Sequence, residues 1–167
     1  MDRNKLLLVF ALVFFVSTAA YVSIGVDRMA WFDEAFTLET VQLLNSGVDI
    51  NFAEFDVHPP AYYVSLASWM SFAPDGLSET QWARFFSIFW GVVFFIFVYL
   101  LVRKLQFSSF VAGSVTLLMS LSTTFLHYFT EIRMYGMLLA LTSVVIYLLF
   151  RFFNVVVIVT NLYNTRV

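Results

Sequence analysis

Residues 6–26 read LLLVFALVFFVSTAAYVSIGV, a run without a charged side chain that decides the class of fold. Its length matches the ~20 apolar residues that an α-helix needs to cross a bilayer core. A cleaved signal peptide is the alternative interpretation. Its apolar core usually has only ~7 to 15 residues, and the small residues 17–20 lie inside this run rather than after it. We therefore expect residues 6–26 to form a first membrane span.

The composition of the whole chain is that of a membrane protein. Hydrophobic residues make up 61% of the 167, and only 12% are charged, far outside the range of soluble domains. Cysteine is absent, which excludes disulfides and thiolate chemistry. Further uncharged runs follow the first one. The sequence therefore predicts an all-α, polytopic membrane helix bundle of about four spans, at about 6–26, 82–102, 108–128 and 133–151.

The charges are distributed unevenly along the chain. Nine of the 11 carboxylates fall between Asp27 and Glu79. Basic residues flank the opposite ends of the predicted spans, at Arg3, Lys5, Arg103, Lys104 and Arg151. By the positive-inside rule, these basic positions face the cytoplasm. We expect a multi-pass plasma membrane protein with a cytoplasmic N-terminus and the loop 27–80 outside. The tail 152–167 either extends the fourth span or lies at the interface.

The outward loop is far longer than an ordinary connection, which favours a functional role. Residues 34–47 suit a helix that Gly47 terminates, and a second helix is expected to begin at Pro60. We expect both helices to be interfacial, lying at the membrane surface.

Two adjacent carboxylates, Asp33 and Glu34, directly follow the first span in the run WFDEAF, residues 31–36. A partly desolvated carboxylate in such a setting can act as a general base. The structural alternative is that Asp33 caps the following helix while Glu34 complements its dipole. One residue can do both.

His58 precedes two prolines, which fix an extended backbone and would hold the imidazole rigidly over a site. The alternative is a proline-initiated helix whose preceding residue happens to be histidine. The only other histidine, His127, is far along the chain, so no convincing set of metal ligands is present. We expect no metal and no cofactor.

Two arginines break the inside-positive pattern. Ser78 and Gln81 form a capping-box pattern that opens the second span, which places Arg84 about one turn inside a helix at the outer boundary. Arg133 is expected at the outer end of the fourth span. Paired arginines at headgroup depth suit a lipid phosphate or diphosphate. The alternatives are snorkelling, or pairing of Arg133 with Glu131.

Four segments carry these residues in order: WFDEA at 31–35, HPPAYY at 58–63, ARFFSIFWG at 83–91 continuing into VYLLVRKL at 98–105, and EIRMY at 131–135. In this order they resemble the start of the GT-C superfamily of membrane glycosyltransferases, in its protein O-mannosyltransferase and aminoarabinose-transferase-like branch. The resemblance covers about residues 5–150. Members of that family transfer a sugar from a polyprenyl- or dolichyl-phosphate carrier to an acceptor on the outer face, usually with inversion.

The resemblance implies a role for each matching residue. Asp33 would be the general base that deprotonates the acceptor, with Glu34 beside it. Arg84 and Arg133 would neutralise the carrier phosphate as it leaves. The remaining substrate-binding positions would be His58, Glu131 and Tyr135. An inverting displacement needs such a base on one side of the sugar and cations on the other.

Family members usually continue through many more spans, so residues 1–151 are expected to be the N-terminal part of such a module, truncated or completed by another polypeptide. The expected partners are a lipid-phosphate-linked sugar and membrane lipid, with no nucleic acid. An alternative function is that of a non-catalytic small membrane protein, an assembly partner or a remnant. A transporter fragment is a third hypothesis, but no half-helix break or internal repeat is visible in the spans, which argues against it.

Overall fold

The computed structural model describes residues 3–52 and 59–164, without several side chains of the first helix and those of residues 154–164. Within these ranges the chain forms helices and no strand, so the predicted all-α class is confirmed. The helices are α1 (Arg3–Asp27), α2 (Phe32–Asn45), α4 (Pro60–Met70), α5 (Glu79–Lys104), α6 (Ser109–Ser120), α7 (Thr123–Thr130) and α8 (Tyr135–Asn164).

Two of these helices are long and apolar enough to cross a membrane, namely α5 and the part of α8 that ends at Phe153. The bent pair of α6 and α7 would make a third crossing if it forms one span. Helix α1 coincides with the predicted first span. Some of its side chains lie outside the described residues, so α1 is not among these candidate spans. The described residues therefore have two or three candidate spans, and the count of four stays a prediction.

The predicted third span, 108–128, is not one straight helix. Helices α6 and α7 meet at an angle of 67°. The run 120–124 contains four hydroxyl side chains, and the hydroxyl of Ser120 donates a hydrogen bond to the Leu117 carbonyl at 2.8 Å. Hydroxyl groups compete in this way with the backbone hydrogen bonds of a helix, and Ser122 begins α7 from an extended conformation. The expectation that no span contains a break was therefore wrong.

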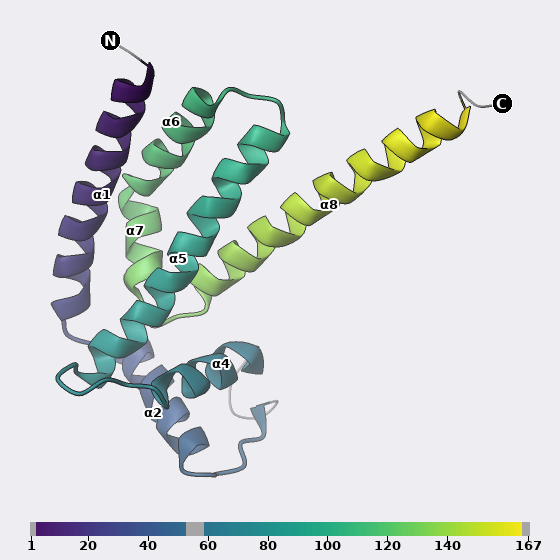
Figure 1. The fold of residues 1–167 in the computed structure, drawn as a ribbon. Coiled ribbons are helices and arrows are strands. Elements are labelled where there is room, and N and C mark those ends of the chain that lie inside the picture. The colour runs from purple at the N-terminus through teal and green to yellow at the C-terminus, as the bar shows by residue number, and fades with distance from the viewer. Residues whose placement is uncertain (1–2, 53–58, 165–167) are drawn as a thin grey trace.

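The helices are arranged in two parts (Figure 1). Helices α1, α5, α6 and α7 lie side by side and form the bundle. Helices α2 and α4 gather at the end of the bundle where α1 ends and α5 begins, and the α5–α6 connection lies at the other end. Helix α8 packs against α5 and then diverges from the bundle. It continues through residues 152–164, so this part of the tail extends the fourth helix.

Helices α2 and α4 share a small apolar core with the first turns of α5. Its buried members are Val41, Tyr62, Tyr63, Leu66, Ala67, Ala83, Phe86 and Ile132. The rings of Trp69 and Trp82 stack at 4.6 Å, and each indole N–H donates a hydrogen bond to the backbone carbonyl of the other residue, at 3.0 and 3.1 Å. These contacts attach α4 firmly to α5. Whether the two loop helices lie at a membrane surface stays a prediction.

Three of the predicted helix ends in the loop are confirmed, whereas α2 begins at Phe32, two residues before the predicted start. Helix α2 ends in a Schellman motif, in which Gly47 has a φ of +81° and the N–H of Val48 reaches back to the Leu43 carbonyl. Helix α4 begins at Pro60, and the Ser78–Gln81 capping box opens α5.

Helix α7 packs closely against its neighbours because they carry glycine at the points of contact. A β-carbon at Gly91 of α5 would lie 2.7 Å from the ring of Phe129, and one at Gly25 of α1 would lie 2.9 Å from the methyl group of Thr130. Small residues allow this close approach between membrane helices. The bend before α7, together with these contacts, brings the residues that follow it to the end of α1.

Candidate functional site

A cluster of charged side chains lies where α1, α2, α5 and the α7–α8 connection meet. It contains three arginines, three carboxylates and one histidine: Arg28, Arg84, Arg133, Asp33, Glu34, Glu131 and His127. These residues come from separate parts of the chain, and the fold brings them to one end of the bundle. We refer to this set as the charged cluster.

Glu34 and Arg84 form the fully buried part of the charged cluster. Both side chains are fully withdrawn from solvent. Nη2 of Arg84 donates to Oε2 of Glu34 at 2.8 Å, and Nε of Arg84 lies 3.4 Å from Oε1. Oε1 also accepts from the backbone N–H of Ile132, at 2.9 Å, and from Nη2 of Arg28, at 3.4 Å. Glu34 thereby connects α2, α5 and the α7–α8 connection.

The remaining donors of Arg84 bind the end of α1. Its Nη1 donates to the carbonyl oxygens of Val26, at 2.9 Å, and of Arg28, and its Nη2 also donates to that of Met29, at 3.4 Å. These carbonyls have no partner within the helix because α1 ends there. A guanidinium has five N–H groups, and all five of Arg84 are used. A phosphate would have to displace these bonds.

Asp33 and Arg133 form a second part of the charged cluster, in which the carboxylate is partly exposed and the arginine is buried. The side chain of Asp33 is 35% exposed, and its Oδ2 lies 3.5 Å from Nη2 of Arg133. The guanidinium of Arg133 is 5.9 Å from the centre of the Tyr135 ring, within range of a cation–π contact. The structure thus brings together three of the predicted site residues.

His127 and Glu131 form the third part of the charged cluster. Nε2 of His127 lies 2.7 Å from Oε1 of Glu131, and the histidine side chain is half exposed. Nδ1 of His127 lies 3.2 Å from Nη1 of Arg28. A guanidinium can only donate, so Nδ1 accepts here and Nε2 donates to the carboxylate. Burial raises the pKa of Glu131, although His127, Arg28 and Arg133 act in the opposite direction.

The capping role that the sequence suggested for Asp33 is wrong. Trp31 is the N-cap residue of α2, and Asp33 lies inside the first turn. Glu34 makes the return contact, because its Oε2 accepts from the backbone N–H of Trp31 at 3.4 Å. Both carboxylates lie in the first turn, where they complement the helix dipole, as expected for Glu34.

His58 lies outside the described residues, so its predicted contact with substrate stays a prediction. Among the residues that the structure describes, no three His, Asp or Glu side chains come together as a metal site.

Sequence reasoning missed Arg28 and His127. Nη2 of Arg28 donates to the Thr130 carbonyl at 3.3 Å and lies 3.4 Å from Oε1 of Glu34. His127 was set aside because its distance from other ligands along the chain was large. The available signal was the hydroxyl-rich break before α7, which turns His127 toward the end of α1.

No protein family, no curated protein and no solved structure was found to match this chain. The resemblance to membrane glycosyltransferases therefore depends on the four short segments alone.

Proposed function

We propose that this chain is the N-terminal part of a membrane glycosyltransferase module that takes its sugar from a polyprenyl- or dolichyl-phosphate carrier. The observation that carries the proposal is the pairing of Asp33 with Arg133. A partly exposed carboxylate and a cation lie side by side at one end of a bundle of apolar helices. Inverting transfer from a lipid phosphate needs a base for the acceptor and a cation for the departing phosphate.

The geometry supports a division of roles within the charged cluster. Asp33 would accept the proton of the acceptor, and Arg133 would bind the carrier phosphate, with Tyr135 beside it. Glu131 and His127 would line the same face. Glu34 and Arg84 would hold the loop in place, because their hydrogen-bonding groups are already satisfied inside the protein. The expected contact of Arg84 with the phosphate stays a prediction, and it would require the phosphate to displace these hydrogen bonds.

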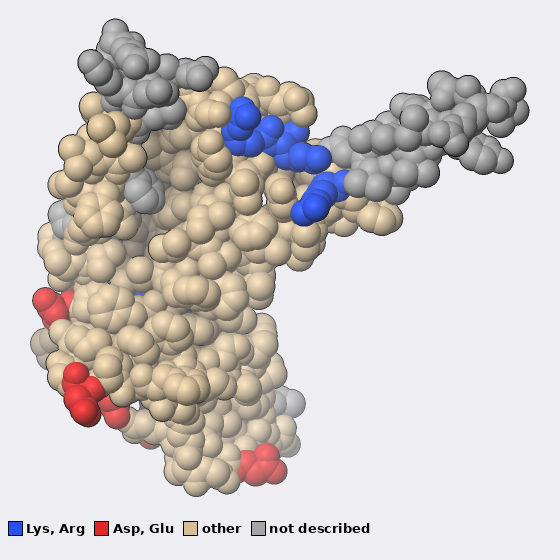
Figure 2. All heavy atoms as spheres, in the orientation of Figure 1, with Lys and Arg blue, Asp and Glu red and all other residues tan. Residues whose placement is uncertain are grey.

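The distribution of charge supports an outward-facing charged cluster at the plasma membrane. Figure 2 shows the visible Lys and Arg side chains near the end of α5 and on α8, while the Asp and Glu side chains lie toward the end that holds α2 and α4. Arg103 and Lys104 lie in the last turn of α5. The positive-inside rule would place this end in the cytoplasm and the charged cluster outside.

The test is photocrosslinking of the purified chain to a polyprenyl-phosphate sugar. Arg133→Ala should abolish the crosslink, and Arg133→Lys should weaken it, since lysine keeps the charge but loses the two-pronged contact with phosphate. Arg151→Ala removes an arginine from the opposite end of the protein and is the matched control. Equal crosslinking of wild type and Arg133→Ala would contradict the proposal.

A second candidate function is that of a non-catalytic membrane protein, an assembly partner or remnant. The observation that favours it is the balance of the charged cluster, in which each of the three carboxylates already lies next to a cation or to His127. Such a cluster can act as a purely structural clamp. Co-purification with a larger membrane complex, without carrier crosslinking, would support this function.

A further inference from the structure

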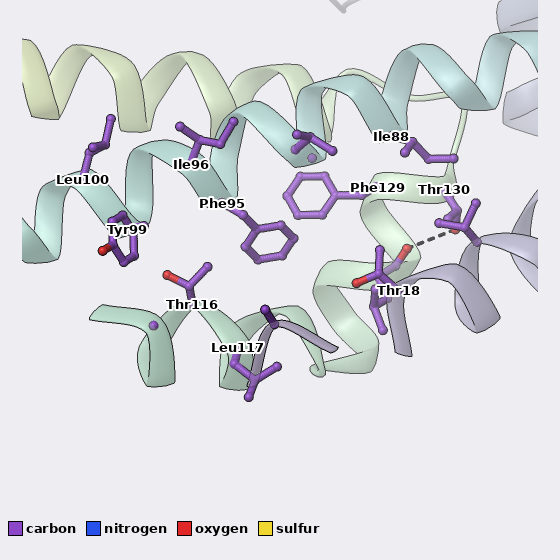
Figure 3. A pocket seen from close by; sticks show the side chains of 16 residues that line it. Thr18, Ile88, Phe95, Ile96, Tyr99, Leu100, Thr116, Leu117, Phe129 and Thr130 are labelled. Carbon is purple, nitrogen blue, oxygen red and sulfur yellow. Dashed lines mark hydrogen bonds between the residues drawn. The ribbon is translucent and has the colours of Figure 1, made fainter. Parts of the chain in front are cut away.

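A groove runs through the bundle below the charged cluster. It has a volume of about 440 Å³ and is lined by side chains of α1, α5, α6 and α7. Figure 3 shows α5 along its length, with Ile88 near Thr18 and Thr130 at one end and Tyr99 and Leu100 toward the other. Val92 and Ile96, which also line it, are about half exposed. The groove is therefore open along one side.

The lining is mostly apolar, with hydroxyl groups at a few positions. The Thr18 hydroxyl is buried without a hydrogen-bond partner among the described residues, and Tyr99 also lines the groove. The hydroxyl groups of Thr116 and Thr130 donate to carbonyls of their own helices, those of Ala112 and Leu126, at 2.9 and 3.0 Å. Water inside such a groove would find few partners, because a buried water needs two to four polar contacts. An empty space would forfeit dispersion contacts along every wall. Within a membrane, hydrocarbon is the material that fills it.

The dimensions select a single chain rather than a helix. The distance along α5 from Ile88 to Leu100 is about 18 Å, at about 1.5 Å per residue. This is close to half of a hydrocarbon core of about 30 Å, the depth of one leaflet. A volume of about 440 Å³ over this length is too small for an α-helix, which is about 10 Å across, and suits a single thin chain.

One end of the groove adjoins a cation. Thr130 lines the groove, and its carbonyl accepts a hydrogen bond from Nη2 of Arg28 at 3.3 Å. Glu34 lies 3.4 Å from Nη2 of Arg28, but its closer partner is Arg84 at 2.8 Å, and Glu131 binds His127 at 2.7 Å. The Arg28 side chain is 28% exposed, so a phosphate at headgroup depth can reach it.

We propose that this groove binds one acyl chain of a membrane phospholipid, with the phosphate of its headgroup at Arg28. The lipid fills the space between α1 and the bent α6–α7 pair, and so stabilises the packing that carries His127 and Glu131. The inference is independent of the proposed function, because an ordinary bilayer phospholipid is sufficient.

The test uses the full chain in vesicles of phosphatidylethanolamine and phosphatidylglycerol, with a diazirine in one acyl chain of the latter. Adducts mapped by mass spectrometry should concentrate on groove residues such as Val92 and Ile96. Gly113 lines the groove, and a β-carbon there would have no neighbour within 4 Å, so Gly113→Leu should fill the space and remove these adducts. Val111→Leu adds bulk on the same helix outside the groove and is the matched control.

A second arm tests the headgroup. Arg28→Gln should reduce groove adducts of the phospholipid but leave unchanged those of a diacylglycerol that carries the same diazirine chain without a phosphate. Wild-type adducts no more frequent at Val92 and Ile96 than at the outward-facing Leu118 would overturn the proposal, and so would groove adducts that persist in Gly113→Leu. No sugar carrier is present in the vesicles, so this outcome does not depend on the transferase proposal.

Discussion

Asp33 and Glu34 are neighbours in the sequence, but they belong to two parts of the charged cluster that have different surroundings. Glu34 has no exposed surface and accepts hydrogen bonds from Arg84 and from the backbone of Ile132. Asp33 is 35% exposed, and its contact with Arg133 is 3.5 Å long. The Arg133 side chain is itself only 9% exposed, so this pair is exposed on the Asp33 side alone. We expect it to cost less to break than the fully buried pair of Glu34 and Arg84. The comparison separates the charges that support the fold from those available for chemistry.

The largest effect is expected from Arg84→Ala. This change leaves Glu34 as an uncompensated buried charge and removes the donors that bind the end of α1, so we expect a loss of about 3–5 kcal/mol in the free energy of unfolding. Thermal unfolding in detergent, followed by circular dichroism, measures it. Arg103→Ala, which removes an exposed arginine from the same helix, is the control. Equal melting temperatures for the two variants would contradict a structural role of Arg84.

Glu34→Gln sharpens the comparison because it keeps the shape of the side chain, removes the charge and replaces one acceptor oxygen by an NH2 group. The amide retains an acceptor for Ile132 but leaves Arg84 without a counter-charge. We expect destabilisation of about 3 kcal/mol, near the lower end of the range for a broken buried pair. Glu39→Gln on the exposed side of α2 should unfold like wild type in the same assay. A wild-type melting temperature for Glu34→Gln would show that the pair contributes nothing.

A smaller effect is expected from Arg28→Gln. Arg28 lies between the part of the cluster that contains Glu34 and the part that contains His127. Arg28 contacts the carbonyl of Thr130, Glu34 and His127, but these hydrogen bonds are 3.2 to 3.4 Å long and the side chain is partly exposed. We expect a loss of about 1 kcal/mol, typical of a modest net hydrogen bond. Chemical denaturation in detergent would measure it. A loss as large as that of Arg84→Ala would contradict the claim that the buried pair of Glu34 and Arg84 contributes most of the stability of the charged cluster.

The smallest effect is a pH dependence that involves Glu131. Burial raises its pKa above the ordinary value of 4.5. The folded protein therefore holds this proton more tightly than the unfolded chain. Its contribution to stability is fully present below pH 4.5 and is lost as the pH rises through the raised value. Glu131→Gln cannot ionise, so its melting temperature should fall less than that of wild type between about pH 4 and about pH 7. Parallel curves would contradict this assignment.

The local features of the fold could be predicted from the sequence. Gly47, Pro60 and the Ser78–Gln81 capping box set helix ends at the expected residues because each acts through its own backbone neighbours. The first turn of α2 also holds Glu34, as expected, although the helix begins early enough to include Asp33 as well.

The partners within the charged cluster could not be predicted in the same way. The pairing of Glu34 with Arg84 joins residues 50 positions apart and depends on how α2 and α5 pack. The contact between Arg28 and His127 depends on the bend before α7 and on the glycines that let α7 approach α1 and α5. These glycines and the run of hydroxyl residues at 120–124 are visible in the sequence, but their effect appears only when the helices are packed.

The most direct test of the account is to measure thermal unfolding and sugar transfer for Asp33→Asn. Transfer of a radiolabelled sugar from polyprenyl phosphate would be followed in membranes that contain the native or completed protein. The account predicts a loss of transfer and a smaller fall in melting temperature than for Arg84→Ala, because Asp33 supplies the base and is partly open to solvent. Unchanged transfer by Asp33→Asn would contradict the account.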